Sequence, residues 1–225
     1  MLEVRNLHKR YLKTPALNDL SFSIPRGQVV GLLGLNGAGK TTLLKLIAGL
    51  LLPDRGEVRF QGEPPRERRG EIAYLPEQNP WPENATPDQV AALLAGTDPS
   101  FDRGRFRALL EFLEVPRRPF AQMSKGQRAR ANLALALARR APLYLLDEPL
   151  AGIDLISRDR ILRALVREWR EDAALILSTH EVTEAEALFD RAIFLKEGQV
   201  VKDVLVEELR REGKSVVETF KEVLA

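Results

Sequence analysis

The chain has 225 residues, of which 44% are hydrophobic and 29% are charged, a composition typical of a folded protein with a substantial core. Its 34 Lys and Arg against 32 Asp and Glu give a net charge of +2, too small an excess over a whole domain to indicate nucleic-acid binding. The absence of Cys excludes disulfides, thiolate metal sites and a cysteine nucleophile. No apolar run approaches the roughly 20 residues that cross a bilayer, and no signal sequence opens the chain. We therefore expect a cytoplasmic protein that reaches a membrane only through a partner.

The first part of the chain is predicted to be rich in strands. Leu2–Val4 and Leu20–Ile24 have the pattern of short strands, and the continuously apolar Val29–Leu33 is typical of a strand covered on both faces. A glycine-rich turn follows, and then a helix over Thr41–Ala48 that ends at Gly49. Two further short strands are predicted at Val58–Phe60 and Ile72–Tyr74.

From Pro80 the pattern becomes helical. Thr86-Pro87-Asp88-Gln89 is a capping box with Pro at the first helical position, and the helix that it opens is expected to end near Gly96. Two more helices are predicted at Arg103–Leu113 and Lys125–Arg140, the second because Ala and Leu are strong helix formers.

After Pro142 the strand pattern resumes. The expected elements are strands at Leu143–Leu146 and Leu175–Ser178, a helix between them at Ser157–Trp169, a hairpin of Ala192–Leu195 with Gln199–Lys202, and helices at Val204–Arg211 and Ser215–Leu224. Alternating strands and helices predict an α/β fold with a mostly parallel sheet, preceded by antiparallel N-terminal strands. We expect residues 1–79 and 141–225 to form one core, with residues 80–140 inserted as a helical subdomain.

Residues 34–41, Gly-Leu-Asn-Gly-Ala-Gly-Lys-Thr, match the pattern G-x-x-x-x-G-K-[ST] in full. Its glycines let the backbone turn so that successive N–H groups point at one anion. The helix that follows Gly39 adds the positive end of its dipole. We expect Lys40 to reach the β- and γ-phosphates of a nucleotide and the Thr41 hydroxyl to bind Mg²⁺.

Polar residues follow two of the predicted buried strands. Asp147 and Glu148 directly follow the predicted strand Leu143–Leu146. Ligands in open α/β sheets bind beyond the carboxyl ends of strands. We therefore expect Asp147 to bind Mg²⁺ and Glu148 to polarise an attacking water. Neighbours on a regular strand point to opposite faces. Both acids therefore share one site only if the strand ends there, which Pro149 supports. His180 follows the second strand and is expected to contact the γ-phosphate.

These residues make the sequence resemble the nucleotide-binding domain of ATP-binding-cassette (ABC) proteins over nearly its whole length. The motifs are, in chain order, Walker A at Gly34–Thr41, a Q-loop at Glu77 or Gln78, the signature Met123-Ser124-Lys125-Gly126-Gln127, Walker B ending at Asp147-Glu148, the D-loop Ala151-Gly152-Ile153-Asp154 and the switch histidine His180. The signature separates this family from other P-loop NTPases. Tyr11 matches the aromatic residue that stacks on adenine.

The sequence departs from the family pattern at three points. Met123 and Lys125 stand where the signature usually has Leu and Gly, and Ala151 stands where the D-loop commonly has Ser. The Q-loop register leaves both Glu77 and Gln78 as candidates.

The resemblance implies a Mg²⁺-dependent ATPase that works as a homodimer, or as a heterodimer with a similar ATPase, with Ser124 and Gly126 reaching the nucleotide of the opposite chain. The implied ATP contacts are Tyr11, Gly34, Leu35, Asn36, Gly37, Ala38, Gly39, Lys40, Thr41, Thr42, Glu77, Gln78, Ser124, Gly126 and Gln127. The implied Mg²⁺ ligands are Thr41, Asp147 and Gln78. The implied catalytic residues are Glu148, His180 and Lys40.

The resemblance further implies an ATP-hydrolysing transporter subunit that energises a separate membrane-spanning permease, on the cytoplasmic face of the membrane. The expected docking region is Asn79–Ala85 together with the helices after it, and Trp81 is either an anchor or a buried residue. Three stretches are similar to ATPases of ABC-2-type exporters: the Ser-Lys-Gly-Gln signature, Ile156–Asp159 and Ser178–Val201. The alternative is a non-transport ABC ATPase, of the iron–sulfur-assembly type or a nucleotide-dependent regulator.

Overall fold

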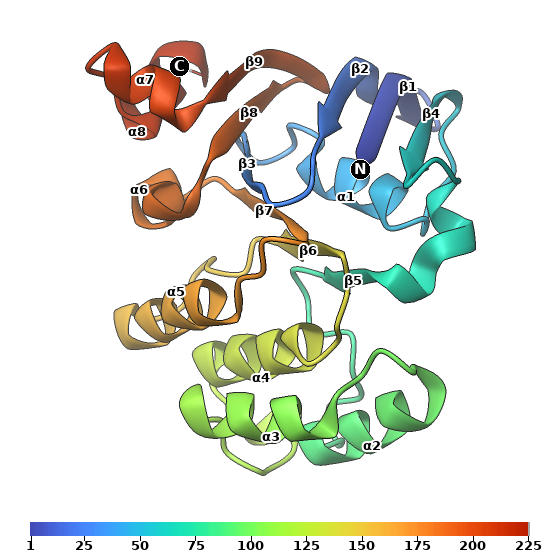
Figure 1. The fold of residues 1–225 in the computed structure, drawn as a ribbon, viewed down its shortest axis with the longest axis vertical. Coiled ribbons are helices and arrows are strands. Elements are labelled where there is room, and N and C mark those ends of the chain that lie inside the picture. The colour runs from blue at the N-terminus through green and yellow to red at the C-terminus, as the bar shows by residue number, and fades with distance from the viewer. Residues whose placement is uncertain (225) are drawn as a thin grey trace.

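The computed structural model describes residues 1–224, and its strands form two sheets (Figure 1). The smaller sheet is antiparallel, in the order β2-β1-β4, and is built from β1 (Leu2–Tyr11), β2 (Thr14–Ile24) and β4 (Arg55–Phe60). The larger sheet has the order β5-β6-β7-β3-β8-β9. Its members are β3 (Val29–Leu33), β5 (Ile72–Leu75), β6 (Leu143–Asp147), β7 (Ala174–Thr179), β8 (Arg191–Lys196) and β9 (Gln199–Leu205).

The pairings of the larger sheet are parallel from β5 to β8, and only the β8–β9 pair is antiparallel. Every residue of β3, β6 and β7 is buried, because strands inside a parallel sheet are covered on both faces. This confirms the predicted α/β class, with a mostly parallel sheet and antiparallel N-terminal strands.

The helices fall into three groups along the chain (Figure 1). α1 (Lys40–Ile47) packs between the two sheets, where Leu43 and Leu44 join the core formed with β1 and β2. The second group lies at one end of the molecule and consists of α2 (Pro87–Thr97), α3 (Arg103–Phe112) and α4 (Lys125–Leu137), with α5 (Leu155–Glu168) beside it. The third group consists of α6 (Val182–Ala185), α7 (Val206–Arg211) and α8 (Val216–Leu224). Short 3₁₀ turns complete the elements at Pro65–Glu71, Phe120–Gln122 and Glu186–Leu188.

The helices of residues 80–140 share one hydrophobic core with the large sheet. Phe106 of α3 and Leu133 of α4 belong to the same buried cluster as Tyr144 and Leu146 of β6. The division of the chain into a core and an inserted helical subdomain stays a prediction.

Several element boundaries differ from the predicted ones. β1 and β2 extend well beyond Leu2–Val4 and Leu20–Ile24, because irregular pairing with left-handed residues at Asn6 (φ 44°) and Asp19 (φ 57°) hides the alternation of buried side chains. The helix predicted from Ser157 begins at Leu155, since Asp154 caps it through a hydrogen bond from Ser157 N to Asp154 Oδ1 of 2.9 Å.

Two C-terminal predictions need correction as well. The helix predicted from Val204 begins at Val206, because Val204 and Leu205 still pair with β8 as the end of β9. The one-turn helix α6 was not predicted, since four residues carry no helical periodicity.

Candidate active site

The loop between β3 and α1 is held open by glycines that other residues could not replace without strain. Gly37 and Gly39 have φ of 83° and 105°, the left-handed region that favours glycine. A Cβ on Gly39 would lie 2.6 Å from the carbonyl oxygen of Ala16, and one on Gly34 would lie 2.5 Å from that of Leu195. No side chain caps α1, so the N–H groups of its first turn remain available to an anion beyond the helix end.

Lys40 is the first residue of α1, and its side chain is only 6% exposed. Its Nζ donates to the carbonyl oxygens of Gly34 at 2.7 Å and Leu35 at 3.3 Å, so the side chain folds back over the loop. The same Nζ lies 3.1 Å from Glu148 Oε1. The ammonium of Lys40 and the carboxylate of Glu148 are therefore in direct contact.

The two acids after the β6 strand face one site because the strand ends between them. β6 ends at Asp147, and Glu148 has φ of 49°, which turns the chain out of the regular alternation of a strand. The Glu148 backbone N–H donates to both the backbone oxygen and the Oγ of Ser178, at 3.1 and 3.0 Å. The structure thus contains the break that the sequence required for a shared site.

Asp147 is almost fully buried and accepts three side-chain hydrogen bonds. Its Oδ1 accepts from Thr41 Oγ1 at 3.1 Å and from Ser178 Oγ at 2.7 Å, and its Oδ2 accepts from the Tyr74 hydroxyl at 3.3 Å. Burial, and then the neighbouring Asp147 carboxylate, raise the pKa of Tyr74 above its ordinary value. Tyr74 therefore stays a protonated donor to Asp147.

Sequence reasoning did not identify Ser178 and Tyr74 as site residues. Both belong to strands, and only the pairing of β5, β6 and β7 brings them to the end of β6, where Ser178 is the register partner of Asp147. The available signal was that Ser178 is a hydroxyl at the end of an apolar strand.

His180 follows β7 and contacts Glu148 from the side opposite to Lys40. Its Nδ1 lies 3.0 Å from Glu148 Oε2, and its side chain is 32% exposed. The three residues predicted to be catalytic, Lys40, Glu148 and His180, thus form one continuous group.

A cleft of about 440 Å³ opens above this group. It is lined by Tyr11, Ala16, Asn36, Gly37, Ala38, Gly39, Lys40, Thr41, Thr42, Glu77, Glu148 and His180. Tyr11 is 46% exposed, as expected for an aromatic ring at the edge of an open site. Gly34 and Leu35 contribute backbone oxygens to Lys40 rather than surface to the cleft.

The two Q-loop candidates share one cleft, but only Glu77 also lines the cleft that contains Lys40. Glu77 lines the cleft just described, whereas Gln78 lines a second cleft, of about 400 Å³, together with Lys125 and Asn132 of α4. Asp147, Glu148 and Glu77 also border this second cleft.

The signature residues lie apart from the loop cleft of their own chain. Ser124 caps α4, with its Oγ accepting from Gln127 N at 3.3 Å, while the Gln127 side chain accepts from Ser124 N at 3.0 Å. Neither Ser124, Gly126 nor Gln127 lines the cleft that contains Lys40.

The glycine-rich loop before α1, with acids and a histidine at the carboxyl ends of neighbouring strands, places the chain in the phosphate-binding-loop class of nucleotide-binding proteins. Comparisons with known proteins narrow this class. A family model described as ABC transporter matches residues 17–151. The ABC transporter ATP-binding protein YtrB of Bacillus subtilis (strain 168) is 33% identical over 218 residues, which cover 94% of this chain and 74% of YtrB.

A second relative and a solved structure agree with this match. The SkfA peptide export ATP-binding protein SkfE of Bacillus subtilis (strain 168) is 31% identical over 95% of this chain and 92% of SkfE. A solved structure of an ATP binding subunit of an ABC transporter has a TM-score of 0.85 at 32% identity, over 99% of both chains. The chain therefore belongs to the ABC transporter family, as an ATP-binding ATPase subunit.

Proposed function

We propose that this chain is the Mg²⁺-dependent ATPase of an ABC transporter, that it acts as a dimer, and that Glu148 is its general base. The observation that carries the proposal is the Lys40–Glu148–His180 group at the base of the loop cleft. It joins a cation suited to phosphate, a buried carboxylate suited to accept a proton from water, and a histidine at one site. Membrane association would come from the permease, since within residues 1–224 no helix is long and apolar enough to cross a membrane.

The cleft contains groups that suit the phosphates and the adenine of ATP. The N–H groups of residues 36–42 and the Lys40 ammonium suit the phosphates. The exposed ring of Tyr11 at the same cleft suits the adenine. Gly34 and Leu35 take part through the backbone oxygens that hold Lys40. Glu77 and Gln78 both remain Q-loop candidates, because both border the end of β6.

Thr41 and Asp147 are the residues we assign to Mg²⁺, and their chemistry fits that ion. Thr41 Oγ1 and Asp147 Oδ1 are 3.1 Å apart, and hydroxyl and carboxylate oxygens are the ligands that Mg²⁺ prefers. Gln78 is assigned here on the resemblance, as its side chain lines the adjoining cleft. Bound Mg²⁺ supplies positive charge that neutralises the phosphates. Ser178 and Tyr74 keep Asp147 oriented through their own hydrogen bonds.

Glu148 would accept a proton from the attacking water once Lys40 is engaged by phosphate. Its Oε2 already contacts His180, so the carboxylate keeps a fixed orientation when the contact of Oε1 with Lys40 is given up. His180 would then complete the site beside the γ-phosphate.

The position of the signature supports a dimer. Ser124, Gly126 and Gln127 open α4 but do not line the cleft of their own chain. We infer that they contact a nucleotide across a head-to-tail pair, formed with a second copy of this chain or with a similar ATPase. We assign the permease contact to Asn79–Ala85, where Trp81 packs partly buried against the core and its backbone oxygen accepts from Asn79 Nδ2 at 3.0 Å.

The test is ATP hydrolysis by the purified chain, with and without Mg²⁺, beside the variant Lys40→Ala. We expect hydrolysis that needs Mg²⁺ and that Lys40→Ala abolishes, because the variant removes the cation of the loop. Purification in mild detergent should then recover a membrane-spanning partner. Failure of the wild-type chain to bind or hydrolyse ATP at saturating Mg²⁺ would overturn the proposal.

A further inference from the structure

The segment that carries His180 cannot hold its own conformation. α6, which follows it, has only four residues, far fewer than an isolated helix needs to be stable in water. Glu181 stands at the cap position of α6 and makes no capping hydrogen bond with its side chain. The position of His180 must therefore be set by contacts with the rest of the molecule.

Arg158 of α5 makes two polar contacts to this segment. Its Nη2 donates to Glu181 Oε2 at 2.7 Å, and its Nη1 forms an ion pair with Glu184 Oε1. The Arg158 side chain is 13% exposed and the two glutamates are about 30% exposed. A guanidinium that binds two carboxylates with little solvent contact holds them more firmly than a surface ion pair does.

The start of α5, just before Arg158, contacts α4, the helix that begins with the signature residues. Asp154 caps α5 one turn before Arg158, and its carboxylate accepts from the backbone N–H and the Oγ of Ser157. Gly126 of α4 packs directly on them, because a Cβ on Gly126 would lie 2.6 Å from Asp154 Oδ2 and closer still to Ser157 Oγ. The first turn of α5 is thus in contact with the signature at one end and with the His180 segment at the other.

We propose that Arg158 is a positioning residue for ATP hydrolysis, which holds the Glu181–Glu184 segment against α5 and so keeps His180 at Glu148. The proposal rests on the proposed function, since it assumes that the His180–Glu148 contact serves hydrolysis. Through Gly126, Asp154 and Ser157 the same residue links the state of the signature helix to the position of His180.

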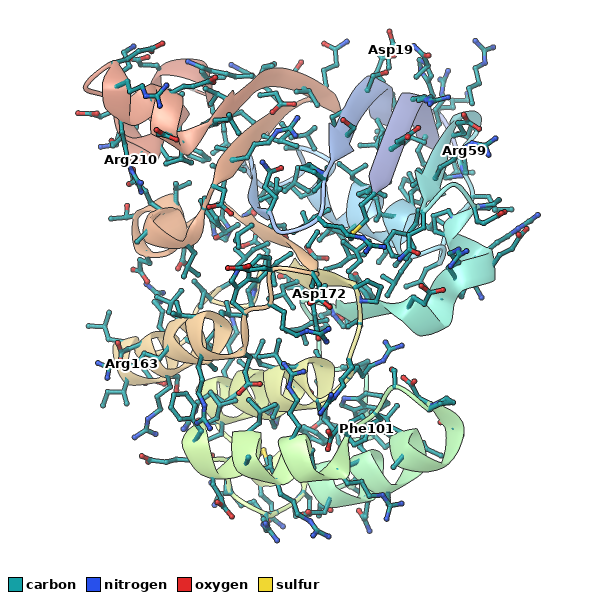
Figure 2. The ribbon with its side chains drawn as sticks, in the orientation of Figure 1. Asp19, Arg59, Phe101, Arg163, Asp172 and Arg210 are labelled. Carbon is teal, nitrogen blue, oxygen red and sulfur yellow. The ribbon has the colours of Figure 1, made fainter. Side chains whose placement is uncertain are left out.

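The experiment compares Arg158→Ala with Arg163→Ala, a matched change on the same helix. Arg163 forms an ion pair with Asp159, both side chains being more than half exposed, and Figure 2 shows Arg163 on the outer side of α5. We expect Arg158→Ala to lower kcat about tenfold or more, with ATP affinity close to that of the wild type. Arg163→Ala should change neither. Hydrogen exchange at residues 180–185 should rise in Arg158→Ala alone.

Conservative variants separate positioning from general stability. Arg158→Lys keeps one charge and should retain an intermediate kcat, and the exchange of charges in Arg158→Glu with Glu184→Arg should recover part of the loss. An unchanged kcat in Arg158→Ala would overturn the proposal. A fall in kcat accompanied by weaker ATP binding and a lower melting temperature would also overturn it, because it would indicate general destabilisation. Wild-type protein without hydrolysis would instead count against the proposed function.

Discussion

The ammonium of Lys40 and the carboxylate of Glu148 lie 3.1 Å apart, and both side chains are more than nine-tenths buried. One comes from the start of α1 and the other from the end of β6. Lys40 is the group expected to bind phosphate, so phosphate and Glu148 compete for the same cation. If Glu148 is the base, as proposed, arrival of the nucleotide would free its carboxylate from Lys40 to accept a proton from water.

The first prediction follows from this competition. Glu148→Gln keeps the shape of the side chain but removes its charge, so Lys40 becomes freer for phosphate and ATP affinity should rise. Hydrolysis should fall by about a hundredfold or more, because the general base is lost. Binding of a fluorescent ATP analogue and phosphate release measure the two effects, and gel filtration with ATP should reveal a stable dimer. The control is Glu207→Gln, at an exposed glutamate of α7, which should leave both ATP affinity and hydrolysis unchanged. Near-normal hydrolysis in Glu148→Gln would remove the base assignment.

The second prediction concerns the ring of Tyr11 at the edge of the cleft. Tyr11→Ala should weaken ATP binding by about 1 kcal/mol, the usual contribution of an aromatic contact, while Tyr11→Phe should bind normally. Inorganic triphosphate has no base to stack, so its affinity should be the same in all three proteins. Isothermal titration calorimetry checks this. Equal losses for ATP and triphosphate would mean that Tyr11 shapes the loop instead.

The third prediction separates the two roles of Ser124, as a helix cap and as a signature residue. Ser124→Ala removes a capping box and should cost about 1 kcal/mol of stability. Thr86→Ala removes the same motif from α2 and should cost a similar amount. Only Ser124→Ala should reduce ATP turnover, with monomer binding of ATP retained. If the two variants turn over ATP equally, Ser124 has no role beyond its cap.

The fourth prediction tests the close approach of α4 to α5. Gly126→Ala places a methyl group against Asp154 and Ser157, and overpacking of this kind costs about 1–3 kcal/mol. Gly96 in α2 has open space where its Cβ would be, so Gly96→Ala should stabilise the protein by up to about 1 kcal/mol. Urea unfolding of both variants measures the difference. Equal stability would show that α4 and α5 separate freely.

The fifth prediction concerns stability at low pH and the ion pair between Asp98, at the end of α2, and Arg139. Burial alone would raise the pKa of Asp98, but hydrogen bonds from Ser100 and the ion pair with Arg139 outweigh it and lower this pKa. The stabilisation is therefore complete above the ordinary pKa of Asp and is lost as the pH falls through the lowered one. Wild-type protein should lose more melting temperature than Asp98→Asn on acidification from about pH 5 to 3. Parallel pH curves would exclude this contribution.

The sequence allowed prediction of residues whose role depends on local pattern. The loop of residues 34–41 and the acids Asp147 and Glu148 were found because each group consists of consecutive residues with a recognisable pattern. The partners of Asp147 were missed because Tyr74 and Ser178 lie on other strands, and only the order β5-β6-β7 brings them together. Arg158 entered the sequence analysis only as part of Ile156–Asp159, and its contact with Glu181 and Glu184 was missed because it depends on how α5 and α6 are placed in the fold.

Phe106 and Leu133, from the helical end of the molecule, share a buried cluster with Tyr144 and Leu146 of the central sheet. Neither region can lose its packing without exposing the apolar surface of the other. Heating should therefore produce a single calorimetric transition, and residues 80–140 expressed alone should aggregate or remain disordered.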